Sequence, residues 1–162
     1  LLAELIECGD RDSLVFVIQV ILEGWGITHY KSLAKDCQNA DLQMVLEGIL
    51  RDEARHHGSG VVLCRQRKIS PETHQYTFEI LVRLLEMVQK GPQGLLAAMD
   101  EVGEGLTREQ KLQFLVEIGA VNQTAKRLEV LRLLMEEDGF SSVVEQLQQF
   151  GCFRPCTPEV CI

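Results

Sequence analysis

Apolar side chains recur every three or four residues along most of this chain, which is the spacing of an amphipathic α-helix. The spacing predicts four substantial helices, over about 13–35, 41–67, 71–90 and 107–137. Shorter helices are expected at 1–8, 93–102 and 141–149. No stretch alternates in the manner of a strand. The joints between the long helices are short, at 36–40, 68–70 and 103–106. Because short joints place consecutive helices antiparallel, the pattern predicts an all-α fold, an antiparallel four-helix bundle with short extra helices.

Residue types that cap helices stand where the periodic stretches begin and end. Gly9 follows the first short helix, and the pair Ser70-Pro71 fits a helix start. Thr107 and Gln110 have the spacing of a capping box. Candidate N-caps of the first two long helices are Asp10, Asp12 or Ser13 and then Asn39 or Asp41.

The first long helix is apolar around most of its girth from Leu14 to Leu22, so we expect it to be deeply buried. Gly24 and Gly26 follow, and a glycine costs about 1 kcal/mol in a helix relative to alanine. These glycines either let a neighbouring helix approach or leave room for a ligand.

The chain has 162 residues, which is the size of one ordinary domain. We divide it into a helical bundle over 1–149 and an irregular tail over 150–162. The tail contains Cys152, Cys156 and Cys161, whose spacing differs from the paired cysteines of a metal-binding knuckle. A zinc ion or a cluster with a fourth ligand elsewhere is one interpretation. We favour a disulfide or thiols without a metal.

Net charge excludes several classes of partner. The charge of −8 and the pI of about 5.0 argue against binding to nucleic acid or to an anionic membrane. The longest apolar run, Leu14 to Leu22, contains Gln19 and is shorter than the roughly 18 residues of a membrane span. Six cysteines in a domain of this size do not form a disulfide framework, so a cytoplasmic location is expected.

Two carboxylates and a histidine interrupt apolar helix faces. Glu23 falls on the same helical row as Tyr30, and Glu53 on the same row as His56. A carboxylate buried without a partner costs several kcal/mol or takes up a proton. Two such carboxylates and an imidazole on adjacent helices therefore indicate a metal ion. Glutamate oxygen with histidine nitrogen suits iron or manganese, and the Tyr30 hydroxyl is placed to orient a carboxylate ligand.

The pattern Glu23-x6-Tyr30, followed by Glu53-x-x-His56, resembles the first half of the metal-site motif of the ferritin-like superfamily, in its rubrerythrin and bacterioferritin group. The match is specific over 16–64 and looser to about residue 137. The resemblance implies an antiparallel four-helix bundle with a non-haem di-iron or di-manganese site between its helices. Complete members of the family carry the pattern twice.

The second half of the family pattern is missing, because the predicted fourth helix contains neither histidine nor tyrosine. On the third helix, Glu86 lies at a depth that matches Glu53, and we include it among the predicted metal ligands. On the fourth helix, Glu117 and Glu129 are the acidic options. Arg132 stands three residues after Glu129, where the family has histidine, and a cation there opposes a second metal ion. We therefore expect a one-metal site, an asymmetric site or a site that has lost its metal.

Two functions follow from these residues. The first is a ferritin-like metalloprotein that holds one or two iron or manganese ions and acts as an oxidoreductase with O2 or a peroxide and a small-molecule substrate. The alternative is a non-catalytic interaction or scaffold module with a degenerate metal site, in which the leucine-rich fourth helix supports a homo-oligomer or binds a partner helix. A third option is a haem or small-ligand pocket lined by His56 and the nearby glycines.

Overall fold

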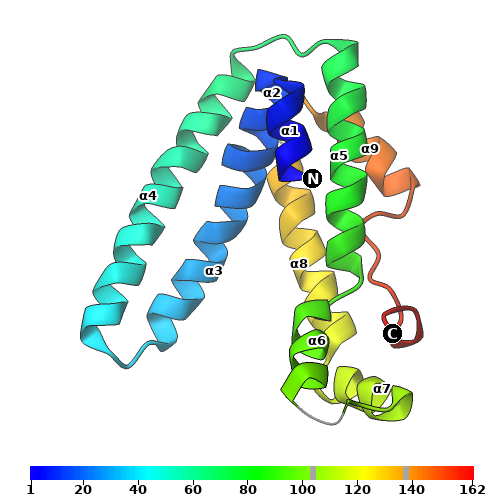
Figure 1. The fold of residues 1–162 in the computed structure, drawn as a ribbon. Helices are drawn as coiled ribbons and strands as arrows, with labels where there is room; N and C mark the ends of the chain where they lie inside the picture. Colours follow the sequence, from blue (N-terminus) through cyan, green and yellow to red (C-terminus); the bar gives the residue numbers. More distant parts are fainter. Residues whose placement is uncertain (103–104, 137–138) are drawn as a thin grey trace.

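The computed structural model describes residues 1–102, 105–136 and 139–162, and within these ranges the chain is helical with no strand. The all-α prediction is therefore confirmed. In chain order the elements are α1 (Leu2–Cys8), α2 (Arg11–Leu14), η1 (Val15–Leu22), α3 (Glu23–Asp36), α4 (Ala40–Arg65), α5 (Pro71–Gln89), α6 (Gln93–Val102), α7 (Arg108–Glu117), α8 (Ala120–Met135), α9 (Ser141–Gln149) and η2 (Pro158–Val160) (Figure 1).

Helices α2, η1 and α3 run into one another as a single long helix, Arg11–Asp36. Its middle part, η1, has the wider hydrogen-bonding pattern of a π-helix, a form that is rare and often marks a functional site. The side chains that this part buries completely are Phe16, Val17, Val20 and Ile21. The expectation of deep burial therefore holds for the first half of the helix, whereas α3 buries only Gly24 and Ala34 among its described residues.

The main core lies between this long helix and α5, α8 and α9. The ring of Phe16 stacks on that of Phe140, with 3.8 Å between the ring centroids. The buried residues that α5 and α8 contribute recur at helical spacing, as Ile80, Leu81, Leu84, Leu85, Leu128, Leu131 and Met135. This core holds the N-terminal half of the long helix in place, and the candidate site lies just beyond that half (Figure 1).

Helix α4 returns along η1 and α3 to form an antiparallel hairpin, drawn at the left of Figure 1. It packs on that helix and has no comparable contact with α5 or α8 among the residues that the structure describes. A Cβ at Gly60 would lie 2.6 Å from the Cβ of Gln19, and a Cβ at Gly24 would lie 2.7 Å from Leu134 of α8. Gly24 and Gly60 therefore permit close packing of helices rather than room for a ligand.

The predicted helix caps are confirmed. The side chain of Asn39 accepts from Leu42 N at 2.9 Å at the start of α4, and Ser70 accepts from Thr73 N at 3.1 Å at the start of α5. Thr107 and Gln110 form the expected capping box of α7. Gly9 ends α1 in the left-handed conformation, and Asp10 caps the helix that follows.

The prediction of one fourth helix over 107–137 is wrong, because the chain breaks it into α7 and α8 at Gly119. Gly119 has a φ of +61°, a left-handed conformation that glycine adopts without strain. Only α8 reaches the main core, whereas α7 lies against the start of α8 and against η2. The predicted helix end at 137 and part of the joint predicted at 103–106 fall outside the described residues.

The C-terminal tail is irregular apart from η2 and is tied to α5. Gln89 Nε2 donates to the carbonyl oxygens of Gly151 and Arg154, at 3.0 and 2.8 Å, and Cys156 N donates to Gln89 O at 3.1 Å. A second, smaller core lies close to the tail and consists of Leu96, Leu115 and Ala120, with Cys161 packed against it.

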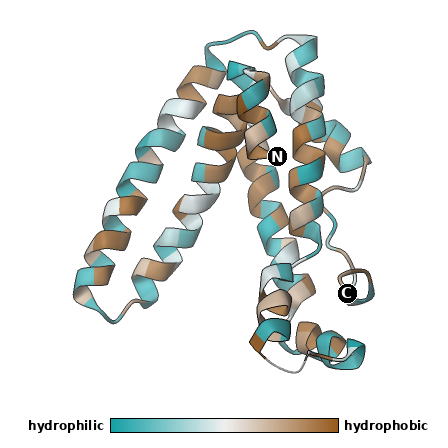
Figure 2. Cartoon of the chain, viewed as in Figure 1, coloured by the Kyte–Doolittle hydropathy of each residue, from teal (hydrophilic) through white to brown (hydrophobic). Residues whose placement is uncertain are grey.

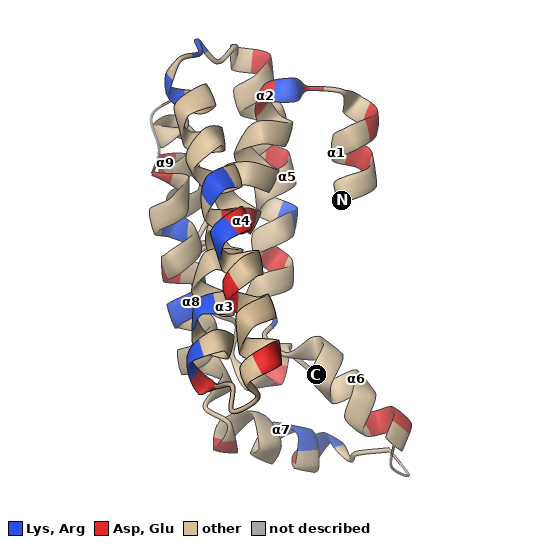
Figure 3. Cartoon of the chain, turned by 90° about the vertical axis from the view of Figure 1, so that its left-hand side faces the viewer, with Lys and Arg blue, Asp and Glu red and all other residues tan. Residues whose placement is uncertain are grey.

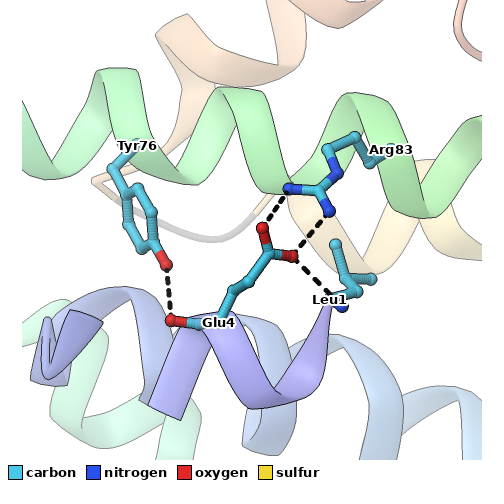
Figure 4. Close-up of polar contacts among 4 residues, drawn as sticks. All are labelled: Leu1, Glu4, Tyr76 and Arg83. Atoms are coloured by element: carbon cyan, nitrogen blue, oxygen red, sulfur yellow. Dashed lines mark hydrogen bonds and ion pairs between the residues drawn. The ribbon is translucent and has the colours of Figure 1, made fainter. Parts of the chain in front are cut away.

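Helix α1 is attached to α5 by polar contacts around Glu4 (Figure 4). Arg83 donates two hydrogen bonds to the Glu4 carboxylate, at 3.0 and 2.6 Å, and the amino nitrogen of Leu1 lies 3.2 Å from the same group. The Tyr76 hydroxyl donates to the carbonyl oxygen of Glu4 at 3.2 Å. These contacts hold α1 beside α5, and Leu5 of α1 is buried in the main core.

Candidate metal centre

Glu23 is the first residue after the π-helical stretch, and its carboxylate lies in the hairpin between α3 and α4. Its side chain is 21% exposed, but one oxygen, Oε2, is completely buried and has no hydrogen-bond partner among the described residues. The Oε1 of Gln19, one turn earlier, is also buried without a partner there. Two buried acceptors without donors are costly, since each keeps the full desolvation penalty of about 1–3 kcal/mol or more. This point of the hairpin therefore favours a bound donor or cation.

The structure brings His56 and Glu53 to Glu23. The Nδ1 of His56 lies 3.5 Å from Glu23 Oε1. Glu53 packs over Gly26, where a Cβ would lie 3.3 Å from Glu53 Oε2. Gly26 thus gives the Glu53 carboxylate its place beside α3, and an alanine there would press on that carboxylate.

The electrostatics of the site act most strongly on Glu23. Burial raises the pKa of Glu23, because it disfavours the charged form, and the nearby imidazoles of His56 and His57 lower it in part. The neighbouring Glu53 carboxylate raises the Glu23 pKa further, because two like charges repel each other. A cation placed between the two carboxylates would reverse both unfavourable effects.

His57 has a structural place that the sequence did not indicate. Its Nδ1 lies 3.0 Å from Val20 O and 3.3 Å from Gln19 O, both in η1. Carbonyl oxygens only accept, so this nitrogen carries the proton and donates. The wide π turn offers these carbonyl oxygens to α4, and His57 binds them. The signal available beforehand was the adjacent pair His56-His57, which puts one imidazole on each side of the hairpin seam.

Tyr30 lies near the Glu53 carboxylate, beside Gly26, without binding it. The edge of its ring would be 3.7 Å from a Cβ at Gly26, and its ring meets that of His29 edge-on, with centroids 5.7 Å apart. Within the described chain its hydroxyl makes no hydrogen bond to Glu23 or Glu53. The role of Tyr30 in orienting a ligand stays a prediction.

The other predicted ligands lie away from this group. Glu86 is exposed on α5, where it acts on Arg83 and on the Cys152 thiol. Glu129 on α8 receives two hydrogen bonds from Arg132, at 2.8 and 2.7 Å, which lower the pKa of Glu129. Glu117 is exposed on α7, outside the main core, and accepts from Gln113. None of the three faces Glu23, so α3 and α4 alone supply the candidate site.

As the side chains stand, no three histidine, cysteine, aspartate or glutamate residues in the described part of the chain are arranged to hold one ion. Glu23, Glu53 and His56 nevertheless offer two oxygen donors and one nitrogen donor on facing helices. His56 is 59% exposed, so its imidazole is free to turn. Such a set is half of the four glutamates and two histidines of a two-metal carboxylate site in a helical bundle.

A cleft of about 560 Å³ adjoins the site between α3 and α8. Its lining includes Trp25, His29 and Tyr30 from α3 and the side chain of Arg127 from α8. Aromatic walls with one cationic group suit a small molecule with an apolar part and a negative charge. Sequence analysis did not find this cleft, because it depends on how α8 lies across α3.

The six cysteines are all described, and none of them forms a disulfide. Burial raises the pKa of the Cys152 thiol, and the exposed Glu86 raises it further. Burial also raises the pKa of Cys161, with a smaller contribution from Cys156. These shifts disfavour the thiolate, which is the form that binds metals and reacts.

One helix in the described part of the chain, Arg11–Asp36, is long and apolar enough to cross a membrane by length and composition, with a mean hydropathy of 1.2 in its most apolar window. The core helix of a globular domain passes the same criterion. Here the apolar half of that helix is packed in the main core.

No protein-family model, curated protein or solved structure matches this chain. The likeness of Glu23-x6-Tyr30 and Glu53-x-x-His56 to a ferritin-like half-site therefore rests on the sequence pattern alone.

Proposed function

We propose that this protein is a ferritin-like metalloprotein whose α3–α4 hairpin binds iron or manganese through Glu23, Glu53 and His56. The observation that carries the proposal is the buried Oε2 of Glu23, which has no hydrogen-bond partner in the described chain while a second carboxylate and an imidazole lie beside it. The proposal takes the α3–α4 hairpin as the counterpart of the first two helices of the family fold.

The donor set supports these metals over others. Hard carboxylate oxygens with one imidazole nitrogen suit iron and manganese, whereas zinc sites and clusters usually recruit thiolates. No cysteine is among the groups that act on the Glu23 carboxyl, which are His56, Glu53 and His57 within the described residues. His57 would hold the helix backbone next to the ion, and Gly26 would leave space for the Glu53 carboxylate.

We further propose an oxidoreductase function. Iron bound with open coordination positions supplies reactivity toward O2 or a peroxide. The exposure of His56 gives a small oxidant access to the site. The adjoining cleft, lined by Trp25, Tyr30 and Arg127, is the place we propose for a small-molecule substrate.

Metal content tests the proposal without any activity assay. Protein loaded with Fe(II) without oxygen, or with Mn(II), and then desalted should retain close to one ion per chain, and its melting temperature should rise on loading. Glu53→Gln and His56→Ala should each weaken metal retention at least tenfold. Glu47→Gln is the matched control, because Glu47 is an exposed carboxylate on the same helix that accepts from Gln43. Close to one ion per chain in both site variants would overturn the assignment.

The same loading experiment distinguishes the proposed metalloprotein from the alternative function. A non-catalytic interaction module would have the same melting temperature with and without Mn(II). The observation in favour of this alternative is the exposed apolar surface of α4, since the side chains of Leu42, Val45 and Val62 are each more than half exposed.

A further inference from the structure

The uncovered side of α4 carries an apolar stripe next to the candidate site. Leu42 and Val45 are 52% and 57% exposed, and Ile49 and Leu63 are half-buried. Their spacing of three, four and seven residues puts them on one side of the helix, together with His56. We call these five residues the open stripe. Figure 2 shows that apolar residues continue along α4 to its Ala40 end, where α3 is the one described helix that lies beside it.

The candidate site is incomplete in one chain. Its three donors all come from one hairpin, and the carboxylates of α5, α7 and α8 that were candidates for the other half are turned elsewhere. A two-metal carboxylate site in a helical bundle needs a glutamate from each of two helices and a Glu-x-x-His pair from each of two others. Two copies of this hairpin supply that set, because each brings Glu23 on one helix and Glu53 with His56 on the next.

We propose that two copies of this chain pair their α3–α4 hairpins about a two-fold axis, with the open stripes in contact, and that Glu23, Glu53 and His56 of both copies form one shared two-metal site. This inference rests on the metal-binding function proposed above. It assigns the exposed apolar residues of α4 to a second copy, because that copy covers the stripe and also completes the site. A two-fold interface is self-complementary, so a single surface is sufficient.

The size of the surface agrees with a stable dimer. Helix α4 has 26 residues and is therefore about 39 Å long. Helix α3 beside it has 14 residues and is about 21 Å long, so two helices about 10 Å wide give a face on the order of 600 Å². Standard interfaces bury about 600–1,000 Å² per partner, and this face lies at the lower end of that range. Charged residues flank the stripe, which fits the polar rim of such interfaces.

Figure 3 shows that both signs of charge occur along α4. Glu47 and Arg65 each lie two residues from a member of the open stripe, which is a rotation of about 200° and places them on the other side of the helix. Arg55 pairs with Asp52 within α4 at 3.3 Å. The open stripe therefore contains no Asp, Glu, Lys or Arg, which fits the charge-depleted centre of a protein interface.

Native mass spectrometry and light scattering in the presence of Mn(II) test the proposal. The wild-type protein should have twice the chain mass of 18.3 kDa and carry two Mn(II) ions per dimer. Val45→Asp, which puts a charge on the open stripe and leaves every donor in place, should give a monomer with Mn(II) affinity at least tenfold lower. Leu42→Lys, one turn away on the stripe, repeats the test with a different side chain. Met44→Asp is the matched control, because Met44 is 66% exposed on the same helix but off the stripe.

Three other results of these measurements would each overturn a different part of the proposal. A monomer that binds one Mn(II) would overturn the shared site and leave the proposed metal function in place. A dimer that retains no Mn(II) would overturn the proposed function, and the shared site with it. A dimer that Met44→Asp disrupts as strongly as Val45→Asp would show that the open stripe is not the interface.

Discussion

His56 and His57 are adjacent in α4, yet their side chains lie in different environments. His56 is largely exposed and approaches the Glu23 carboxylate, whereas His57 is half-buried and binds two backbone carbonyl oxygens of η1. One residue along a helix is a rotation of about 100°, so the two imidazoles lie on opposite sides of the contact with α3. The first is a candidate ligand, and the second stabilises the turn that precedes Glu23.

We expect His57→Ala to reduce the free energy of unfolding by about 0.5–1.5 kcal/mol, because it removes the part-buried hydrogen bond that joins α4 to two backbone carbonyl oxygens of η1. His56→Ala in metal-free protein should change it by less than about 0.5 kcal/mol, since the side chain is mostly exposed. Urea denaturation of both variants without metal measures the two effects. Equal losses in the two variants would contradict the structural role given to His57.

At the scale of elements, two glycines of α4 have opposite environments. A Cβ at Gly60 would collide with the side chain and backbone of Gln19, whereas a Cβ at Gly58 would meet nothing within 4 Å. The first glycine allows α4 and η1 to approach each other, and the second only lowers helix propensity. A comparison of alanine substitutions at these two glycines therefore separates the effect of helix packing from the effect of helix propensity.

We expect Gly60→Ala to destabilise the protein by about 1–3 kcal/mol, because α4 must move away from η1. Gly58→Ala should stabilise it by about 0.5–1 kcal/mol through helix propensity. Chemical denaturation of the two variants provides the comparison. A stabilising Gly60→Ala would mean that the hairpin is looser than the structure describes.

The attachment of α1 to α5 predicts a pH effect on stability. The hydrogen bonds from Arg83 lower the pKa of Glu4 from 4.5 to about 2, with a second contribution from the nearby amino group of Leu1. Since the folded-state pKa lies below the unfolded one, this carboxylate stabilises the fold above pH 4.5, and the contribution is lost as the pH falls toward 2. As the pH falls from 4.5 toward 2, the melting temperature of the wild-type protein should therefore decrease by more than that of Glu4→Gln. High salt should reduce the difference, because the pair is exposed.

At the scale of the whole molecule, the hairpin extends beyond the main core. The half of the hairpin farthest from the core, residues 28–50, buries only Ala34 among its described residues. The opposite half packs on α5, α8 and α9 through Phe16, Val20 and their neighbours. Local opening requires little free energy where few apolar side chains are buried.

Hydrogen exchange should reveal this difference. Backbone amides of residues 28–50 should exchange much faster than those of residues 14–24 in metal-free protein, since their helices unfold locally at low cost. Mn(II) should slow exchange around Glu53 and His56 if the proposed site binds it. Uniform protection along the whole hairpin without metal would contradict the view that its outer half lacks partners.

The local features of the fold were predictable from sequence because they depend on residues a few positions apart. The helical period gave the helices 71–90 and 141–149 to within one residue of α5 and α9. The caps at Asn39, Ser70 and Thr107 depend on side chains that reach backbone groups three residues away. The helix break at Gly119 is a local feature that could not be predicted, since an isolated glycine inside an apolar pattern does not by itself indicate a left-handed turn.

The sequence by itself determined that Glu23, Glu53 and His56 lie on helix faces that a short joint brings together. The tertiary structure alone decided which other residues reach them. It determined that Glu86 lies near the Cys152 thiol and that Glu129 pairs with Arg132. It also determined that His57 donates to a carbonyl oxygen of η1 and that one side of α4 has no described helix packed against it. The physical reason is that these outcomes depend on how helices far apart in the chain dock. Docking is set by the fit of whole surfaces such as the Gly60–Gln19 contact, which no short stretch of sequence contains.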